Sequence, residues 1–296
     1  MLYYRRKILL ALLESFGGEL GKVKLQKLLF LLCKPQTTPS FDFLPYHYGC
    51  FSFQSTWDLG TLAHKYNIIS ETDSSWILNQ KGEYINQISA ADKVRMNVLV
   101  KKYKEATADD LMRLTYTMYP YYAIKSKKAK ALLTSDEFDK VVLSIPIQDE
   151  VALYTIGYEG VSLEKYFNKL IINDVRVLCD VRRNPLSQKV GFSKSTLKKV
   201  CDAFGIIYVH IPELGIESDK RQNLKTQKDY DLLFADYEKN QLVNQTDFVN
   251  DVFDLLVKNE RIALTCFEAS PCQCHRSKVA KAVTQHPNWN FKLKHL

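Results

Sequence analysis

The sequence predicts two domains of different class: a mainly helical, winged-helix-like domain over residues 1–147 and an open parallel, Rossmann-like α/β domain over residues 148–296. Helical spacing of apolar residues dominates the first half, with one pair of short strand patterns. In the second half apolar strand patterns alternate with amphipathic helix patterns. The polar stretch "LLTSDEFDKVVLSIPIQDE", which holds a proline, favours a boundary near residue 148.

Composition is that of a globular chain with a sizeable core, since 46% of the 296 residues are hydrophobic and 25% are charged. No apolar run reaches the roughly 18 residues of a membrane span, and Glu14 interrupts the first apolar stretch, which favours an amphipathic helix over a signal peptide. The odd number of cysteines, 7, favours reduced thiols, so we expect a cytoplasmic protein without membrane contact. The net charge of +8, divided evenly between the halves, permits contact with nucleic acid phosphates without requiring it.

The first 90 residues predict three helices and a hairpin. The first helix ends at the "GG" pair, "KVKLQKLLFLLC" predicts the second, and the third covers about residues 56–66. "NIISETDSSWILNQKGEYI" predicts two short strands around a polar turn, and residues 91–150 are expected to be mainly helical. The second helix should bury its apolar face, which consists of Leu25, Leu28, Leu29 and Phe30. Its polar face should carry Lys22, Lys24 and Lys27.

Five strands are predicted in the second half, from "VALYTIGYEG", "VRVLCDVRRNP", "IIYVHIPELG", "RIALTCFE" and "WNFKLKHL". A helix that Ser162 can cap follows the first strand, and one closed by Gly205 follows the second. Two amphipathic helices, around residues 232–237 and 248–256, precede the fourth strand. Strands that alternate with helices imply parallel pairing with right-handed crossovers.

Ligands of an open parallel sheet gather outside the carboxyl ends of its strands, and polar residues end each of the first four predicted strands here. We predict three catalytic residues: Asp180, His210 and Glu268. Substrate- or phosphate-binding residues at the same ends are Gly157, Tyr158, Arg182, Arg183, Gly215, Cys274, His275 and Arg276. We expect five of these residues to meet in one pocket, namely Asp180, Arg182, His210, Glu268 and Arg276. Two alternatives stay open: an ion pair of Arg182 with Asp180 or Glu268, and a structural His210.

The stretch "TCFEASPCQCHRSKVA" permits several interpretations. A zinc site would use Cys266, Cys272, Cys274 and His275, but Cys274 and His275 are adjacent, whereas structural zinc ligands usually come in spaced pairs. A nucleophilic Cys272 or Cys274 at a helix start is a second interpretation, and a packed cysteine a third. We favour an anion-binding turn in which Arg276 and free backbone N–H groups hold a phosphate, and we expect neither metal nor cofactor.

Four motifs in order, "YTIGYEG", "VLCDVRRNPLSQKVGFSK", "IIYVHIPELG" and "LTCFEASPCQCHRSKVA", resemble the family known as domain of unknown function 488 over residues 151–285. The resemblance implies a small bacterial α/β domain and adds Ser187 and Phe192 to the site residues, while Cys272 lies outside its pattern. In the first half, "VKLQKLLFLL" and "YHYGCFS" resemble Panacea antitoxin-like domains over about residues 20–55. That resemblance implies association with toxin, phage or defence genes and a partner that is protein or DNA.

The first functional hypothesis is a hydrolase that acts on nucleic acid or a nucleotide, in phage defence or another genome conflict. It either removes a modified base from DNA by N-glycosidic cleavage, as a DNA glycosylase does, or hydrolyses a phosphoester, with Asp180 or Glu268 activating water. The alternative is a non-catalytic DNA-binding or antitoxin-like regulator with a nucleotide-sensing α/β domain. Thiol chemistry such as sulfur transfer is a third hypothesis.

Overall fold

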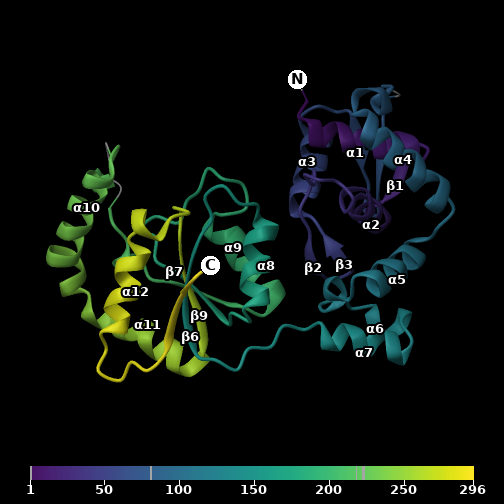
Figure 1. The fold of residues 1–296 in the computed structure, drawn as a ribbon. Coiled ribbons are helices and arrows are strands. Elements are labelled where there is room, and N and C mark those ends of the chain that lie inside the picture. Colours follow the sequence, from purple (N-terminus) through teal and green to yellow (C-terminus); the bar gives the residue numbers. More distant parts are fainter. Residues whose placement is uncertain (1, 81, 218, 222–223) are drawn as a thin grey trace. The chain divides into compact units, whose positions relative to one another are not determined.

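The structure of the chain is a computed structural model that describes residues 2–80, 82–217, 219–221 and 224–296. The chain divides into two compact units, Met1–Ile145 and Pro146–Leu296 (Figure 1). Among the described residues, no helix combines the length and the apolar character needed to span a bilayer.

The first part of the N-terminal unit has the element order expected of a winged helix. Its elements are α1 (Tyr4–Ser15), β1 (Glu19–Gly21), α2 (Lys22–Cys33), α3 (Phe53–His64), β4 (Ile69–Glu71) and β5 (Ser75–Leu78). The strands form an antiparallel sheet in the order β1-β5-β4. The sequence indicated only a turn-rich stretch between the second and third helices, whereas the structure has a hairpin there, β2 (Leu44–Tyr46) and β3 (Gly49–Phe51).

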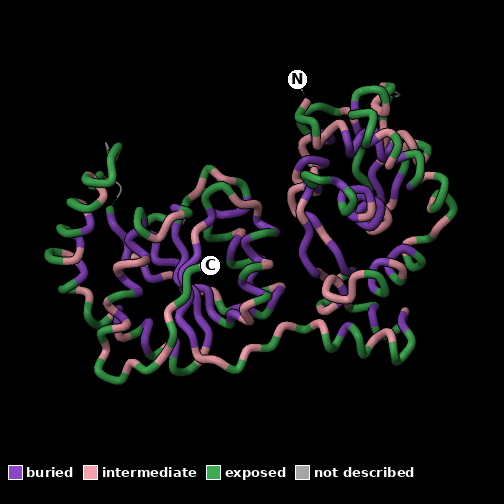
Figure 2. The backbone as a smooth tube through the Cα atoms, viewed as in Figure 1, coloured by how far each residue is buried: buried purple, intermediate pink, exposed green. Residues whose placement is uncertain are grey.

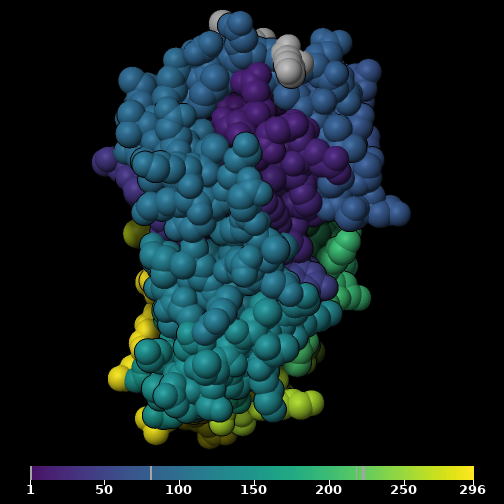
Figure 3. Space-filling model, turned by 90° about the vertical axis from the view of Figure 1, so that its right-hand side faces the viewer, coloured from purple at the N-terminus to yellow at the C-terminus, as the bar shows by residue number. Residues whose placement is uncertain are grey.

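The rest of this unit is helical, as expected. It comprises η1 (Tyr84–Gln87), α4 (Ala90–Tyr103), α5 (Ala108–Met118), η2 (Pro120–Ala123), α6 (Ala129–Leu132) and α7 (Ser135–Leu143). Thr107 and Thr134 begin α5 and α7 with capping boxes, which satisfy backbone N–H groups of the first turn. Figure 3 shows the segment from α4 to α7, blue to teal, on one surface of this unit.

Helix α2 is the centre of the N-terminal core. The four apolar side chains predicted to be buried are fully buried: Leu25, Leu28, Leu29 and Phe30. The expected polar face is wrong for Lys27, which is also buried and donates from Nζ to the carbonyl of Cys50 at 2.8 Å. Lys22 instead pairs with Glu71, with 2.8 Å between Nζ and Oε1.

The C-terminal unit is built on the predicted parallel sheet. Its five strands, in the spatial order β10-β6-β9-β7-β8, are β6 (Ala152–Gly157), β7 (Val177–Asp180), β8 (Ile207–His210), β9 (Arg261–Cys266) and β10 (Lys292–His295). All four pairings are parallel. Purple, buried backbone runs along β6, β7 and β9 (Figure 2), as expected for strands with apolar residues on both faces.

Helices cover both faces of this sheet (Figure 1). One face carries α8 (Leu163–Ile172) and α9 (Lys194–Phe204), and the other carries α10 (Gln227–Asp236), α11 (Thr246–Asn259) and α12 (Arg276–Thr284). Short helical turns connect them: η3 (Pro212–Leu214), η4 (Asp219–Arg221), η5 (Tyr237–Gln241), η6 (Leu242–Asn244) and η7 (Pro271–Gln273). Ser162 caps α8 by accepting from the N–H of Lys165 at 3.1 Å, and Gly205 ends α9 with a left-handed φ of 72°, both as predicted.

Candidate functional site at the carboxyl edge of the sheet

Four strands deliver their last residues to one edge of the sheet. Gly157 of β6 is in register with Cys266 of β9, while Asp180 of β7 is in register with Thr265 and with His210 of β8. Since β9 lies between β6 and β7, residues from distant parts of the chain adjoin at this edge, where an open α/β sheet binds its ligands.

Asp180 and Arg182 form a buried, two-pronged ion pair at the end of β7. Arg182 donates from Nε to Oδ1 at 2.8 Å and from Nη2 to Oδ2 at 2.5 Å. Its Nη1 donates to the Tyr158 hydroxyl at 2.8 Å and to the Phe192 carbonyl at 2.9 Å. Although burial alone would lower it, the bonds and charge of Asp180 raise the pKa of Arg182 above its usual value. The structure therefore realises the alternative of an internal ion pair and leaves Arg182 little capacity to hold a phosphate.

The carboxylate of Asp180 is saturated by donors. Besides Arg182, the Tyr208 hydroxyl donates to Oδ2 at 2.6 Å. Burial and the charge of Asp180 raise the pKa of this tyrosine, so it stays a donor. Asp180 is fully buried. A catalytic base needs a lone pair that water can reach, so this environment argues against the predicted catalytic role of Asp180.

Tyr158 and Phe192 stack on each other beside this pair. Their ring centroids lie 4.5 Å apart at an interplanar angle of 9°, and both side chains are buried. The stack covers one face of each ring, and burial of both side chains leaves the other faces closed to solvent. Neither of these two predicted site residues therefore has a ring face open to a substrate base.

Two predicted site residues, Gly157 and Gly215, are required by backbone packing. A Cβ on Gly157 would collide with the carbonyl of Glu268, and one on Gly215 would collide with the backbone of Arg183. The loops after neighbouring strands approach closely at both positions, so a glycine is needed whether or not a ligand binds.

Glu268 is the other carboxylate of this edge. It is 7% exposed, and its Oε2 lies 3.4 Å from Sγ of Cys266, which donates to it. Its Oε1 forms an ion pair with Arg221 of η4. Sequence reasoning missed Arg221, because nothing in a polar loop far from β9 indicates which carboxylate it meets.

Arg276 holds the loop that follows β9. The residue is 1% exposed, its Nη1 donates to the carbonyl of Glu268, and its Nη2 donates to that of Ala269 at 3.0 Å. Its Nε has no hydrogen-bond partner among the described residues. The predicted anion-binding turn is corrected accordingly, since Arg276 binds backbone carbonyls and Cys274 and His275 are buried. The five residues expected in one pocket thus fall into two groups, Asp180 with Arg182 and His210, and Glu268 with Arg276.

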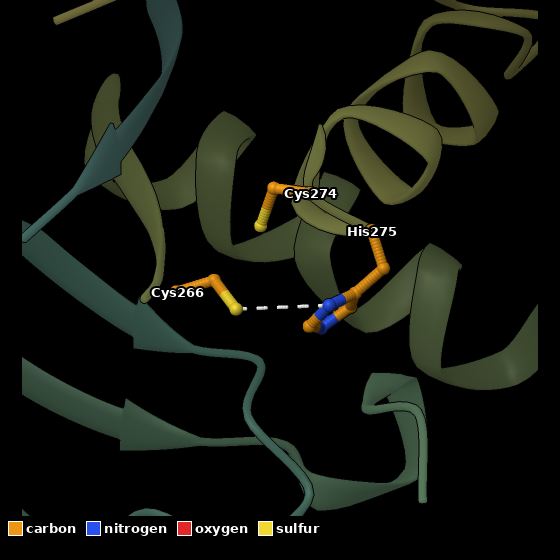
Figure 4. A group of neighbouring side chains, drawn as sticks. All are labelled: Cys266, Cys274 and His275. Carbon is orange, nitrogen blue, oxygen red and sulfur yellow. Dashed lines mark hydrogen bonds between the residues drawn. The ribbon is translucent and has the colours of Figure 1, made fainter. Parts of the chain in front are cut away.

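Cys266, Cys274 and His275 bring three ligand atoms together in the interior (Figure 4). Sγ of Cys266 lies 3.6 Å from Nδ1 of His275, whose Nε2 lies 2.9 Å from the carbonyl of Val181. The carbonyl only accepts, so Nε2 carries a proton and Nδ1 faces the thiols as an acceptor when the ring is neutral. Cys272, by contrast, is exposed.

The two thiols of this cluster have different acidities. Burial alone would raise the pKa of Cys266, but the hydrogen bond from Cys274 and the positive charges of Arg221 and Arg276 lower it to about 7. Burial, followed by the bond to Cys266, raises the pKa of Cys274 well above the ordinary range. One thiol therefore gives up its proton readily while the other keeps it.

Cationic and polar side chains surround the edge on its solvent side. Arg183 and Lys194 are exposed, Lys189 donates from Nζ to the carbonyl of Tyr158 at 2.6 Å, and Ser187 accepts from the N–H of Lys189 at 3.2 Å. His210 has its Nε2 2.9 Å from the carbonyl of Arg182 and its Nδ1 3.0 Å from Nζ of Lys194. Its ring is thus hydrogen-bonded at both nitrogens, as in the structural alternative considered for it.

The fold and this edge define a two-unit protein whose open parallel α/β unit combines buried thiols, a nearly buried carboxylate and a cationic rim. Residues 162–283 match the family model described as Domain of unknown function DUF488, so the C-terminal half of the chain carries a domain of this family. No curated protein matches the chain. The resemblance stated for the second half is thereby confirmed, while the Panacea-like resemblance of the first half stays a prediction.

Proposed function

We propose that the C-terminal unit is a hydrolase that acts on a nucleotide or a nucleic acid, with Glu268 as the base that activates water. One observation carries the proposal: a nearly buried carboxylate lies at the ligand-binding edge of the sheet and is paired with Arg221, whose guanidinium is partly exposed. A carboxylate in such an environment is a candidate base, and its cationic partner is a candidate phosphate contact.

The rim supports an anionic substrate. Arg183, Lys194 and Arg221 come from the segments that follow β7 and β8, and each has an exposed or partly exposed side chain. Arg183 pairs with Glu217, with 3.8 Å between Nη2 and Oε1, and both side chains are about half exposed. Such surface pairs contribute about 0–1 kcal/mol, so a substrate phosphate can displace Glu217 at little cost.

The ion pair of Glu268 with Arg221 suggests how a substrate would prepare the base. A phosphate that binds Arg221 draws the guanidinium away and leaves an oxygen of Glu268 free. That oxygen then takes a proton from water as the water oxygen bonds to the sugar carbon or to phosphorus. The bond to the departing base or alkoxide breaks, and the leaving group acquires a proton from solvent. Both N-glycosidic and phosphoester hydrolysis fit this sequence.

The test is turnover by the purified full chain. DNA duplexes with ordinary and modified bases, and free nucleotides, are incubated with the protein, and released bases and cleaved strands are resolved. We expect Glu268→Gln to lose about 100-fold or more in rate, the usual contribution of a general base, while substrate binding is kept. Glu217→Gln, which alters an exposed carboxylate of the same edge, is the matched control and should retain the wild-type rate.

Two outcomes would contradict the proposal. If the wild type binds nucleotide or DNA but converts none of these substrates, the α/β unit is a sensing module, as in the regulator alternative. If Glu268→Gln turns over as fast as Glu217→Gln, Glu268 is not the base.

A further inference from the structure

The proposed hydrolysis leaves the cluster of Cys266, Cys274 and His275 without a role. Two sulfur atoms and one imidazole nitrogen from these residues lie within 4.8 Å of one another. In Figure 4 the three side chains point toward a common centre, Cys266 from the end of β9 and the other two from the turn before α12.

The spacing of these atoms fits a tetrahedral ion. Zinc bound to sulfur at about 2.3 Å and to nitrogen at about 2.0–2.1 Å, in tetrahedral geometry, places the two ligand atoms about 3.5 Å apart. The observed separation of Cys266 Sγ and His275 Nδ1 is 3.6 Å. Oε2 of Glu268 lies at a similar distance from the same sulfur, 3.4 Å. Closing the whole cluster around an ion therefore requires movements of about 1 Å or less.

His275 is held in the orientation that metal ligands have. Its Nε2 donates to the carbonyl of Val181 at 2.9 Å, which fixes the ring and leaves Nδ1 to bind an ion. Metal-bound histidines commonly donate their second ring N–H to a backbone carbonyl in this way. Val181 follows β7 directly, so an ion here would tie the end of β7 to the end of β9.

Burial distinguishes an ion site from a nucleophile. Cys266 and Cys274 are 0% exposed and His275 is 1% exposed. A nucleophilic thiol must meet its substrate, whereas an ion needs only the ligand atoms and a path for entry. Thiolate sulfur combined with imidazole is the donor set of zinc sites. Sequence spacing disfavoured a zinc site of Cys266, Cys272, Cys274 and His275, because Cys274 and His275 are adjacent. In the structure Cys272 is exposed, but the ligand atoms of the other three residues converge.

We propose that Cys266, Cys274 and His275 bind one Zn²⁺ ion, with Glu268 beside the fourth coordination position. Binding replaces the two thiol protons, which pass to solvent, by two sulfur–zinc bonds. Where Glu268 leaves the fourth position to water, the ion would make that water more acidic next to the base. This last point rests on the proposed function, whereas ion binding does not.

The experiment uses metal alone and the full chain. Zinc content is measured on the protein as purified, and chelator-treated, fully reduced protein is titrated with Co²⁺, which gives visible absorption bands when bound by thiolates in tetrahedral geometry. We expect one equivalent to bind, and we expect Cys274→Ser to lose the bands. Cys272→Ser is the matched control, because Cys272 is exposed in the same turn and should leave the spectrum and stoichiometry unchanged.

Circular dichroism of each variant separates loss of the site from loss of the fold, and the wild-type titration is decisive without any variant. A fully reduced wild type that binds neither Zn²⁺ nor Co²⁺ overturns the proposal, as does a signal lost in Cys272→Ser but kept in Cys274→Ser. Stoichiometric binding without any hydrolysis supports the ion site and contradicts the proposed function, so the two failures are distinguishable.

Discussion

The ends of β7 and β9 lie side by side in the sheet, and each carries a carboxylate close to an arginine, yet they differ in what their polar atoms contact. After β7, Asp180 and Arg182 satisfy each other, with Tyr208 and Tyr158 completing a buried network. After β9, Glu268 meets a partly exposed arginine from a distant loop and lies against a thiol. The Asp180–Arg182 pair is buried and its polar atoms are satisfied within the protein, so its role is structural. The partner of Glu268 is partly exposed, so a ligand can reach this second pair.

The largest effect is expected from a substitution that breaks the buried hydrogen-bond network around Asp180 and Arg182. Arg182→Ala leaves the carboxylate of Asp180 buried without its counter-charge, so we expect the C-terminal unit to lose about 3–5 kcal/mol of its free energy of unfolding. The full chain is unfolded in urea, and hydrogen exchange of peptides from the parallel sheet reports the free energy of unfolding of the C-terminal unit separately.

Arg176→Ala is the control for that change. Arg176 pairs with Glu260 at 2.7 Å in the same unit, but both side chains are about half exposed, so the loss should stay below about 1 kcal/mol. Equal losses in the two variants would show that the β7 network contributes no more than a surface pair.

An intermediate loss of stability is expected from a substitution at Gly157, where the end of β6 approaches the loop after β9. Gly157→Ala places a Cβ against the carbonyl of Glu268 and must displace the loop after β9, at a cost of about 1–3 kcal/mol. The same displacement should weaken Co²⁺ uptake by the thiol cluster. Both quantities are measured on the full chain, by urea unfolding and by the visible titration.

Gly21→Ala serves as the comparison. A Cβ there would meet its nearest atom, the carbonyl oxygen of Ser74, at an ordinary 3.7 Å. It should therefore leave Co²⁺ uptake unaltered. Normal uptake in Gly157→Ala would mean that the β9 loop tolerates the shift and that the cluster does not depend on this close approach.

The smallest effect concerns Tyr208. Tyr208→Phe removes the hydrogen bond to Asp180 and should cost about 1.5 kcal/mol at neutral pH, at the low end for a bond to a charged group because the tyrosine is partly exposed. The raised pKa of Tyr208 in the folded state makes its contribution complete below the usual tyrosine value near 10. The contribution declines as the pH rises above that value.

The pH dependence checks this assignment. The difference in free energy of unfolding between wild type and Tyr208→Phe should shrink above about pH 10, because only the wild type then has an unfolded state stabilised by ionisation of this group. A difference that stays constant to pH 11 would show that the hydroxyl is not held by Asp180.

Local patterns were sufficient to predict much of the fold. Apolar runs ending in polar residues predicted four strands of the parallel sheet, and the fifth, β10, was also expected, in "WNFKLKHL". The period of the leucines in α2 predicted which of them are buried. The hairpin of β2 and β3 was not predicted from the sequence, because its strands are three residues each and include Pro45, which weakens any strand pattern. The burial of Lys27 was not predicted, because its hydrogen-bond partner, the carbonyl of Cys50, is a backbone atom with no sequence signature.

The site was predictable as a region but not as a set of contacts. Polar residues after apolar strands indicated the edge, since that inference requires only topology. Which arginine meets which carboxylate depends on loop conformation, so the sequence left Arg182 with two candidate partners, Asp180 and Glu268. The hydrogen bond between Tyr208 and Asp180 could have been predicted from strand periodicity. Tyr208 and His210 are two residues apart and so lie on the same face of β8, and His210 is in register with Asp180 of β7.

The central position of β9 bears on how the C-terminal unit folds. β6 and β7 precede it in the chain, yet β9 lies between them in the sheet, so β6 cannot be joined to the β7–β8 pair until the chain has returned through α11. Pairings between such distant segments form slowly, because the loops must close before any contact is gained. We expect β9 to join β6 to the β7–β8 pair in one late kinetic step. The thiol cluster at the end of β9 would then exist only in chains that have completed it.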